Sequence, residues 1–148
     1  MYQEHRKKNF VISTDPAKLN VDAVHAYLSQ ESYWAQGIPK EIVARAINHS
    51  LCFGVYDGNH QIGFARVISD YATYAYLSDV YILEGYRGKG LSKWLMECIM
   101  AHLNLQKLRR FSLATKDAHG LYERFGFTAL QNPETIMEIR NADAYKEL

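Results

Sequence analysis

One glycine-rich, basic segment constrains the fold of this chain more than any other feature of its sequence. Residues 84–93 read Glu-Gly-Tyr-Arg-Gly-Lys-Gly-Leu-Ser-Lys. They follow an apolar run at 74–83, which predicts a long strand, and they open an amphipathic run at 90–103, which predicts a helix. Glycines at such a junction let main-chain N–H groups approach a ligand, and the first helical turn carries partial positive charge. The segment therefore predicts an anion site, most naturally for a pyrophosphate. A plain helix start behind a flexible basic loop is the simpler alternative.

The spacing of this segment excludes two common phosphate-binding motifs. A P-loop requires lysine directly after its second glycine, whereas Leu91 follows Gly90. A dinucleotide-binding fingerprint requires a third glycine at the position that Lys93 occupies. A nucleotide or phosphate binder of either of these two classes is therefore a weak alternative.

The rest of the chain alternates short strands with amphipathic helices. Apolar runs bounded by turn residues predict further strands at 10–12, 51–56, 62–68, 111–114 and 136–139. Helical periodicity predicts helices at 21–30, from Pro39 onward, and at 118–125, where Gly126 suits a C-cap. We therefore expect a mixed α/β fold, a mostly antiparallel sheet flanked by helices.

Composition limits the functional classes. The 148 residues suit one domain, 1–148, with polar ends at about 1–8 and 141–148. A net charge of +1 argues against a nucleic-acid partner. No apolar run approaches the ~18 residues of a membrane span. The two cysteines form no disulfide framework, and no histidine or cysteine grouping has metal-ligand spacing. We expect a cytoplasmic protein without a metal.

Two motifs in order resemble those of the GNAT superfamily of N-acetyltransferases. Residues 87–92, Arg-Gly-Lys-Gly-Leu-Ser, are similar to its acyl-CoA signature of Arg or Gln, two residues, Gly, one residue, then Gly or Ala. Ser92 departs from that signature but is small. Residues 120–127, Gly-Leu-Tyr-Glu-Arg-Phe-Gly-Phe, resemble the later Leu-Tyr-x-x-x-Gly-Phe segment. The resemblance implies the GNAT fold, acetyl-CoA as cosubstrate and, as one possibility, a homodimer.

The resemblance also implies which residues hold acetyl-CoA. In the family a splayed central strand offers main-chain N–H groups to the pantetheine and to the thioester carbonyl, and a tyrosine hydroxyl points at the CoA sulfur. Tyr122 matches that tyrosine, which would act as general acid; a packed core tyrosine is the alternative. The segment around Thr115 and Asp117 would lie along the pantetheine. The expected cofactor contacts are Val80, Tyr81 and Ile82 through the main chain, then Arg87, Gly88, Lys89, Gly90, Leu91, Ser92, Thr115 and Asp117.

The acceptor side, the part of the site that would bind the amine, is less constrained by the sequence. Asp79 interrupts an apolar strand, so its carboxylate must be solvated or paired. It is a candidate general base or amine anchor, with an ion pair to a neighbour such as Arg66 as the alternative. Some relatives carry Glu near the position of Ser78, which cannot serve as a base, and Glu84 is a second candidate. Loop aromatics often shape a pocket or plug a junction. Those expected on the acceptor side are Tyr33, Trp34, Tyr71 and Tyr74.

Together these features predict an N-acetyltransferase that moves the acetyl group of acetyl-CoA to the amine of a small molecule. The reaction would proceed by direct attack in a ternary complex. A non-catalytic acyl-CoA sensor on the same fold is the alternative, because the general base is not identified.

Overall fold

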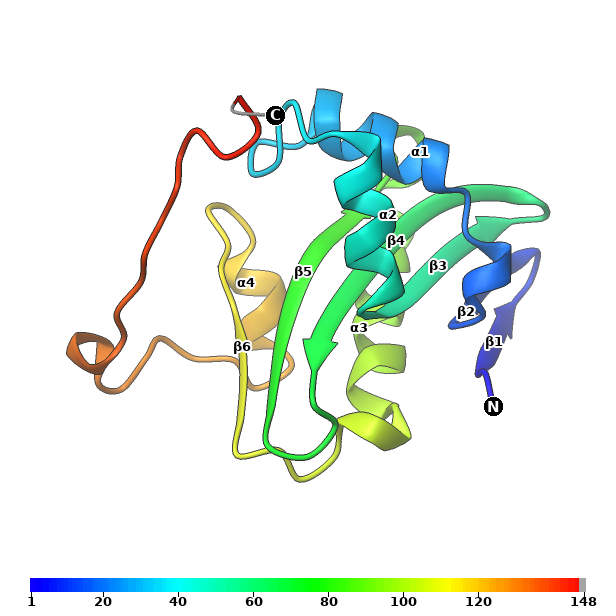
Figure 1. Ribbon diagram of the computed structural model, residues 1–148. Coiled ribbons are helices and arrows are strands. Elements are labelled where there is room, and N and C mark those ends of the chain that lie inside the picture. The colour runs from blue at the N-terminus through cyan, green and yellow to red at the C-terminus, as the bar shows by residue number, and fades with distance from the viewer. Residues whose placement is uncertain (147–148) are drawn as a thin grey trace.

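A computed structural model describes residues 1–146 and shows a six-stranded sheet whose strands lie in chain order (Figure 1). Neighbouring strands from β1 to β5 pair antiparallel, and β6 pairs parallel with β5. This confirms the expected mixed, mostly antiparallel sheet. The strands are β1 (Glu4–Lys7), β2 (Phe10–Ser13), β3 (Leu51–Asp57), β4 (His60–Ser69), β5 (Tyr74–Ile82) and β6 (Arg110–Leu113).

Helices cover both faces of the sheet. On one face α1 (Val21–Ala26), the π-helical turn η2 (Tyr27–Glu31) and α2 (Lys40–Asn48) enclose a core that includes Phe64 and Tyr81. On the other face α3 (Leu91–Ala101) packs on the sheet, and Tyr122 of α4 (His119–Glu123) joins the same core (Figure 1). Because β5 and β6 are parallel, the chain must cross between them, and α3 makes that crossover. The expected helix at 21–30 is thus divided between α1 and η2.

Further short 3-10 turns complete the elements. They are η1 (Pro16–Lys18), η3 (Glu84–Tyr86), η4 (Leu103–Leu105) and η5 (Pro133–Thr135).

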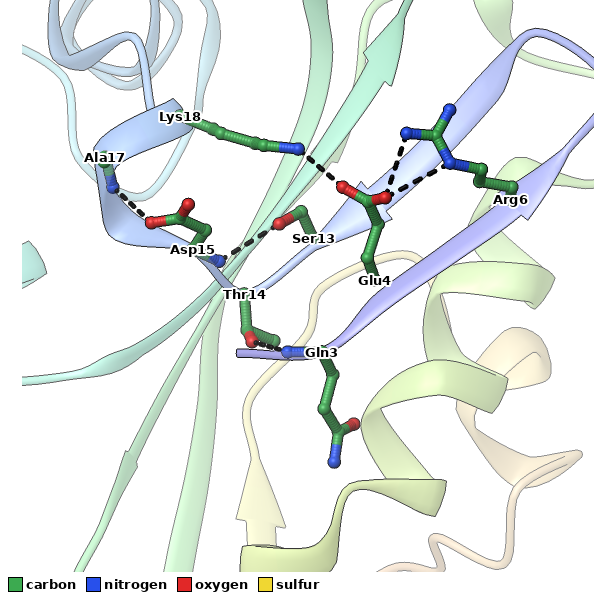
Figure 2. A network of polar contacts seen from close by, with 8 residues as sticks. All are labelled: Gln3, Glu4, Arg6, Ser13, Thr14, Asp15, Ala17 and Lys18. Carbon is green, nitrogen blue, oxygen red and sulfur yellow. Dashed lines mark hydrogen bonds and ion pairs between the residues drawn. The ribbon is translucent and has the colours of Figure 1, made fainter. Parts of the chain in front are cut away.

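The polar N-terminal residues take part in the sheet through β1, a strand that sequence analysis did not predict. β1 pairs with β2 from Glu4↔Ser13 to Lys7↔Phe10. Side chains reinforce this pairing, as Figure 2 shows: the Glu4 carboxylate accepts from both Arg6 and Lys18. The Gln3 amide also donates to the Thr14 hydroxyl at 2.9 Å. A polar strand at a sheet edge can therefore form without an apolar face to signal it.

At the C-terminal end, the predicted strand at 136–139 was also wrong. After η5 the chain runs outside the sheet without pairing with any described strand (Figure 1). Met137 and Ile139 are almost fully exposed, at 93% and 103%. The apolar pattern of 136–139 is typical of a strand. A strand needs a hydrogen-bonded partner, however, and this segment does not pair with β6. The predicted polar end at 141–148 can be followed to Lys146, and 147–148 lie outside the described residues.

Candidate active site

β6 pairs with only the first part of β5, and a cavity lies where this pairing ends. Their parallel pairing runs from Tyr74↔Arg110 to Leu77↔Leu113 and stops there. The cavity has a volume of about 400 Å³. That volume lies within the range of about 300–1,000 Å³ usual for small-molecule sites. Its walls are Tyr33 and Trp34 from the loop after η2, residues 76–80 of β5, residues 113–118 after β6, and Tyr122.

A backbone irregularity at Asp79 marks the point of separation. Asp79 has a positive φ of 56°, and the β4–β5 register shifts between Phe64 and Arg66 on the opposite strand. Such a bulge bends a strand and redirects its side chains and amides. Aspartate tolerates the left-handed region better than most residues do. The bulge thus turns the end of β5 away from β6.

Beyond the bulge, the main-chain amides of β5 point alternately toward β4 and toward the opposite side, where β6 has ended. This unpaired side of β5 is called the opening below. Leu83 donates its N–H to Ile62 at 2.8 Å, on the β4 side. Because successive residues of a strand face opposite ways, Tyr81 also presents its amide to β4, whereas Val80 and Ile82 present theirs to the opening. The Ile82 carbonyl agrees with this, because it accepts from Arg87 rather than from β4. The structure thus divides the three expected main-chain contacts into two that face the opening and one that does not.

The glycine segment lies directly after this strand. Gly88 and Gly90 adopt positive φ values of 80° and 78°, a conformation that glycine reaches without strain. Gly90 caps α3, and no side chain among residues 1–146 makes a capping hydrogen bond to the start of the helix. Unsatisfied helical N–H groups attract anions. Lys89 is exposed beside them, whereas the Leu91 side chain is buried in the core. The main chain of 88–92 therefore offers the ligand-facing groups.

Arg87 joins the glycine segment to the open strand. Its Nε donates to the Ile82 carbonyl at 2.9 Å, and a terminal nitrogen donates to the Tyr27 hydroxyl at 3.1 Å. The Tyr27 ring in turn stacks on Tyr81, with centroids 3.8 Å apart. Sequence reasoning did not identify Tyr27, since it lies 60 residues from Arg87. Arg87 is thus held at the end of the opening.

Tyr122 lies against the cavity from α4 and is 8% exposed. Burial raises the pKa of its phenol to about 12, because a phenolate would lose solvation, and Tyr33 and Asp117 add to the rise. Its ring packs edge-on against Phe127, with centroids 6.1 Å apart. No group of residues 1–146 hydrogen-bonds its hydroxyl. The hydroxyl is therefore a protonated donor without an internal partner.

Asp79 has both carboxylate oxygens engaged. Oδ2 accepts from Arg66 Nε, and Oδ1 accepts from Trp34 Nε1, each at 2.8 Å. Arg66 also reaches the Ser50 hydroxyl at 3.1 Å. The ion pair with Arg66, which the sequence left as the alternative, is confirmed, and its side chains are only 16% and 9% exposed. Asp79 therefore anchors Trp34 and the bulge.

The aromatic residues expected on the acceptor side separate into two places. Tyr33 and Trp34 line the cavity, with their rings edge to face at 5.0 Å. Tyr71 lies in the β4–β5 hairpin and Tyr74 opens β5, and neither lines the cavity. Tyr76, which sequence reasoning missed, lines it instead. Side chains alternate between the two faces of a strand, so Tyr76 is expected on the same face as Tyr74. This alternation could have identified Tyr76 from the sequence.

Residues 113–118 form the wall opposite β5. Thr115 and Asp117 both line the cavity. The Thr115 hydroxyl accepts from the Ala118 amide at 3.1 Å, which fixes the turn into α4. The Lys116 amide donates to the Tyr33 hydroxyl at 2.9 Å, so this wall is tied to the loop after η2. A hydrogen bond thus joins two lining segments of the cavity that lie far apart in the sequence.

Glu84 lies in η3 and outside the cavity lining. Within residues 1–146, no group of three or more His, Cys, Asp or Glu side chains is arranged to hold a metal ion. No helix in the same part of the chain is long and apolar enough to cross a membrane.

The chain is similar to known acetyltransferases over most of its length. The model of the Acetyltransferase (GNAT) family matches residues 21–127. A crystal structure of a GNAT-family protein from Xanthomonas campestris pv. campestris is 52% identical. It covers 95% of this chain and 99% of its own, with a TM-score of 0.91. A protein of Gibberella zeae that is named as an acetyltransferase is 34% identical over 140 residues, 81% of this chain and 79% of its own.

A more distant structure shares the fold alone. A GNAT family acetyltransferase from Elizabethkingia anophelis is 14% identical and covers 92% of this chain and 91% of its own. It has a TM-score of 0.62, and its crystal structure holds acetyl-CoA. Together with the closer matches, it confirms the predicted fold.

Proposed function

The chain belongs to the GNAT family of acetyltransferases, and from this premise we propose that it transfers the acetyl group of acetyl-CoA to the amine of a small molecule. The observation that carries the proposal is the succession of two features along one stretch of chain. β5 lines the cavity up to Val80, and the glycine segment follows β5 and leads into the start of α3. A ligand with an anionic head and an extended arm fits that pairing.

The chain's main-chain groups would hold the cosubstrate. The N–H groups of 88–92 suit the pyrophosphate, with the basic Lys89 beside them. Val80 and Ile82 would donate their open amides to the pantetheine arm and to the thioester carbonyl, because both face the opening. Thr115 and Asp117 line the opposite wall. Tyr81 would contribute through its ring, which supports Tyr27 and thereby Arg87.

Acetyl-CoA supplies an activated acyl group and a thiolate as leaving group. In direct attack, the amine nitrogen forms a bond to the thioester carbon, the carbon–sulfur bond breaks, and the nitrogen loses a proton to solvent. An amide at Val80 or Ile82 would stabilise the negative charge that develops on the carbonyl oxygen. Tyr122 would donate its phenolic proton to the leaving sulfur, because its raised pKa keeps it protonated at neutral pH.

Asp79 is better suited to positioning than to accepting this proton. Its two oxygens already accept from Arg66 and Trp34. Through Trp34 it would set the shape of the acceptor side, where Tyr33 and Tyr76 also face the cavity. Aromatic faces attract a cationic amine. The volume of about 400 Å³ supports an acceptor of small-molecule size.

The decisive experiment incubates the protein with acetyl-CoA and a panel of small amines and follows release of free thiol. Amine-dependent release is the expected result. A thermal shift with CoA but not with ATP, without release for any amine, would instead indicate the acyl-CoA sensor. No shift with CoA would contradict both readings.

A further inference from the structure

Two aromatic side chains of the loop after η2 form a corner on the wall of the cavity. The rings of Tyr33 and Trp34 stand edge to face, with centroids 5.0 Å apart and an interplanar angle of 85°. Both rings line the cavity and are nevertheless 48% and 40% exposed. Exposed apolar surface that gathers at a cavity marks a place where a ligand binds. The corner thus leaves two ring surfaces open to a ligand.

Hydrogen bonds at their polar ends hold both rings in place. The indole Nε1 of Trp34 donates to the Asp79 carboxylate at 2.8 Å, and the Tyr33 hydroxyl accepts from the Lys116 amide at 2.9 Å. Each bond ties the loop to a segment far away in the sequence. A surface that is fixed before binding loses little conformational freedom when the ligand arrives. The aromatic corner is therefore preorganised.

Tyr76 adds a third ring to the lining, from β5. It is half-buried, and no hydrogen bond within residues 1–146 engages its hydroxyl. Aromatic rings attract one another edge to face or offset, and such contacts stabilise a complex beyond the area that they bury. A ligand that carries a flat aromatic ring would gain these contacts, whereas a saturated ligand of the same size would not.

The charges of the lining are suited to a single ammonium group. Two carboxylates line the cavity, and that of Asp79 is already paired with Arg66. No hydrogen bond or ion pair within residues 1–146 engages the other, that of Asp117. Lys116 also lines the cavity, and its Nζ lies over the Tyr33 ring, 5.5 Å from the centroid. The described lining therefore offers one unpaired carboxylate.

Asp117 also lies at the reacting end of the cavity. Tyr122, the proposed donor to the leaving sulfur, lines the same cavity. The negative charge of Asp117 is among the causes that raise the pKa of the Tyr122 phenol, which places the two groups within electrostatic reach. An ammonium group held at Asp117 would lie beside the thioester after losing its proton to solvent.

We propose that the acceptor is an arylalkylamine, a single primary amine joined to an aromatic ring by a short chain; this inference rests on the acetyl transfer proposed above. The ring lies against Tyr33, Trp34 and Tyr76, and the amine lies at the Asp117 carboxylate. Polyamines and aminoglycosides would bring further ammonium groups for which the described lining has no free carboxylate. An amino acid would place its own carboxylate near that of Asp117, which is repulsive.

A matched pair of amines provides the first test. The two compounds are 2-phenylethylamine and 2-cyclohexylethylamine, which share chain length and approximate size and differ in aromaticity. The kcat/KM for 2-phenylethylamine should be higher by roughly three- to tenfold. Spermidine and phenylalanine should be poorer acceptors than either. Equal values for the matched pair, or a preference for spermidine or phenylalanine, would overturn the arylalkylamine assignment and leave acetyl transfer intact.

A binding measurement separates failure of this inference from failure of the transfer reaction. Calorimetric titration of 2-phenylethylamine into the CoA-saturated protein should show one site. Binding without thiol release from acetyl-CoA for any amine would count against the transfer reaction and would support the ligand class. No binding of 2-phenylethylamine would overturn the ligand class, whatever other amines are acetylated.

Two variants test the ring contact and the carboxylate separately. Tyr76→Leu should raise KM for 2-phenylethylamine by roughly three- to tenfold, with little change for 2-cyclohexylethylamine or acetyl-CoA. Asp117→Asn should raise KM for both amines by about tenfold or more, because both lose the charged partner of their ammonium group. Tyr74→Leu is the matched control: Tyr74 lies on the same strand, is 40% exposed and does not line the cavity.

Melting temperatures establish that each variant is folded before its KM is compared. If Tyr76→Leu behaves like Tyr74→Leu, the ring contact is refuted. If Asp117→Asn leaves KM for both amines unchanged, Asp117 does not hold the ammonium group.

Discussion

Replacing Tyr122 by phenylalanine removes the proposed general acid and nothing else from the packed core. The ring keeps its contact with Phe127, and no hydrogen bond within residues 1–146 is lost. Removing a hydroxyl that has no protein partner should change the free energy of unfolding by less than about 1 kcal/mol. The chemical step should be affected far more, because a general acid contributes roughly 10²–10⁴-fold, or about 3–5 kcal/mol of barrier.

The measurement combines a single-turnover rate with a melting temperature on the same preparation of Tyr122→Phe. We expect the rate to fall by about 10²-fold or more, with unfolding and CoA affinity near those of the wild type. The pH dependence adds a check on the wild type. Because burial raises the pKa of Tyr122 to about 12, this phenol should stay protonated, and its contribution to the rate should not decline between neutral pH and about pH 10.

Tyr56 offers a matched control within the same protein. It is 6% exposed, lies in β3, and carries a buried hydroxyl without a hydrogen-bond partner in the described chain. Tyr56→Phe should therefore be neutral or stabilising, by up to about 1 kcal/mol, and should leave the rate unchanged. If Tyr122→Phe turns over as fast per folded molecule as Tyr56→Phe, the general-acid role of Tyr122 is refuted and it is a packing residue only.

Three further predictions test the glycine segment, the bulge at Asp79 and the two thiols. Gly90→Ala and Gly58→Ala should lose similar stability, about 1–2 kcal/mol, because both glycines have positive φ and an added Cβ would meet no protein atom within 4 Å. Calorimetric titration should show weakened CoA binding for Gly90→Ala alone. Equal CoA affinities of the two variants would show that this segment does not bind the pyrophosphate. Asp79→Asn leaves the buried Arg66 charge unpaired, so the free energy of unfolding should fall by about 3–5 kcal/mol. The rate per folded molecule should change only a few fold. A rate about 10²-fold lower at unchanged stability would instead make Asp79 the base. Burial raises the pKa of Cys52 to about 12 and that of Cys98 to about 11, so neither thiol should react with a disulfide reagent at pH 8 until the protein unfolds. Rapid labelling of the native protein would contradict this.

The features that sequence alone determined depend on neighbours along the chain. Helix α3 and the strand before it follow from local periodicity, and Gly88 and Gly90 take the positive φ that their glycine identity allows. Tyr122 lines the cavity, and the resemblance of residues 120–127 to the family's later segment had singled it out. Sequence also indicated that Asp79 needs a partner, since a carboxylate within an apolar strand is costly when unpaired.

Tertiary structure decided whatever depends on segments far apart in the chain. The indole of Trp34 reaches Asp79 across 45 positions, and no local pattern encodes that contact. The strand expected at 136–139 shows the same limit: its side chains suit a strand, but strand formation depends on which edge is within reach. Conversely, the polar β1 forms because β2 supplies hydrogen-bond partners, whatever its own pattern. A strand is stable only when paired, and pairing is set by the fold as a whole.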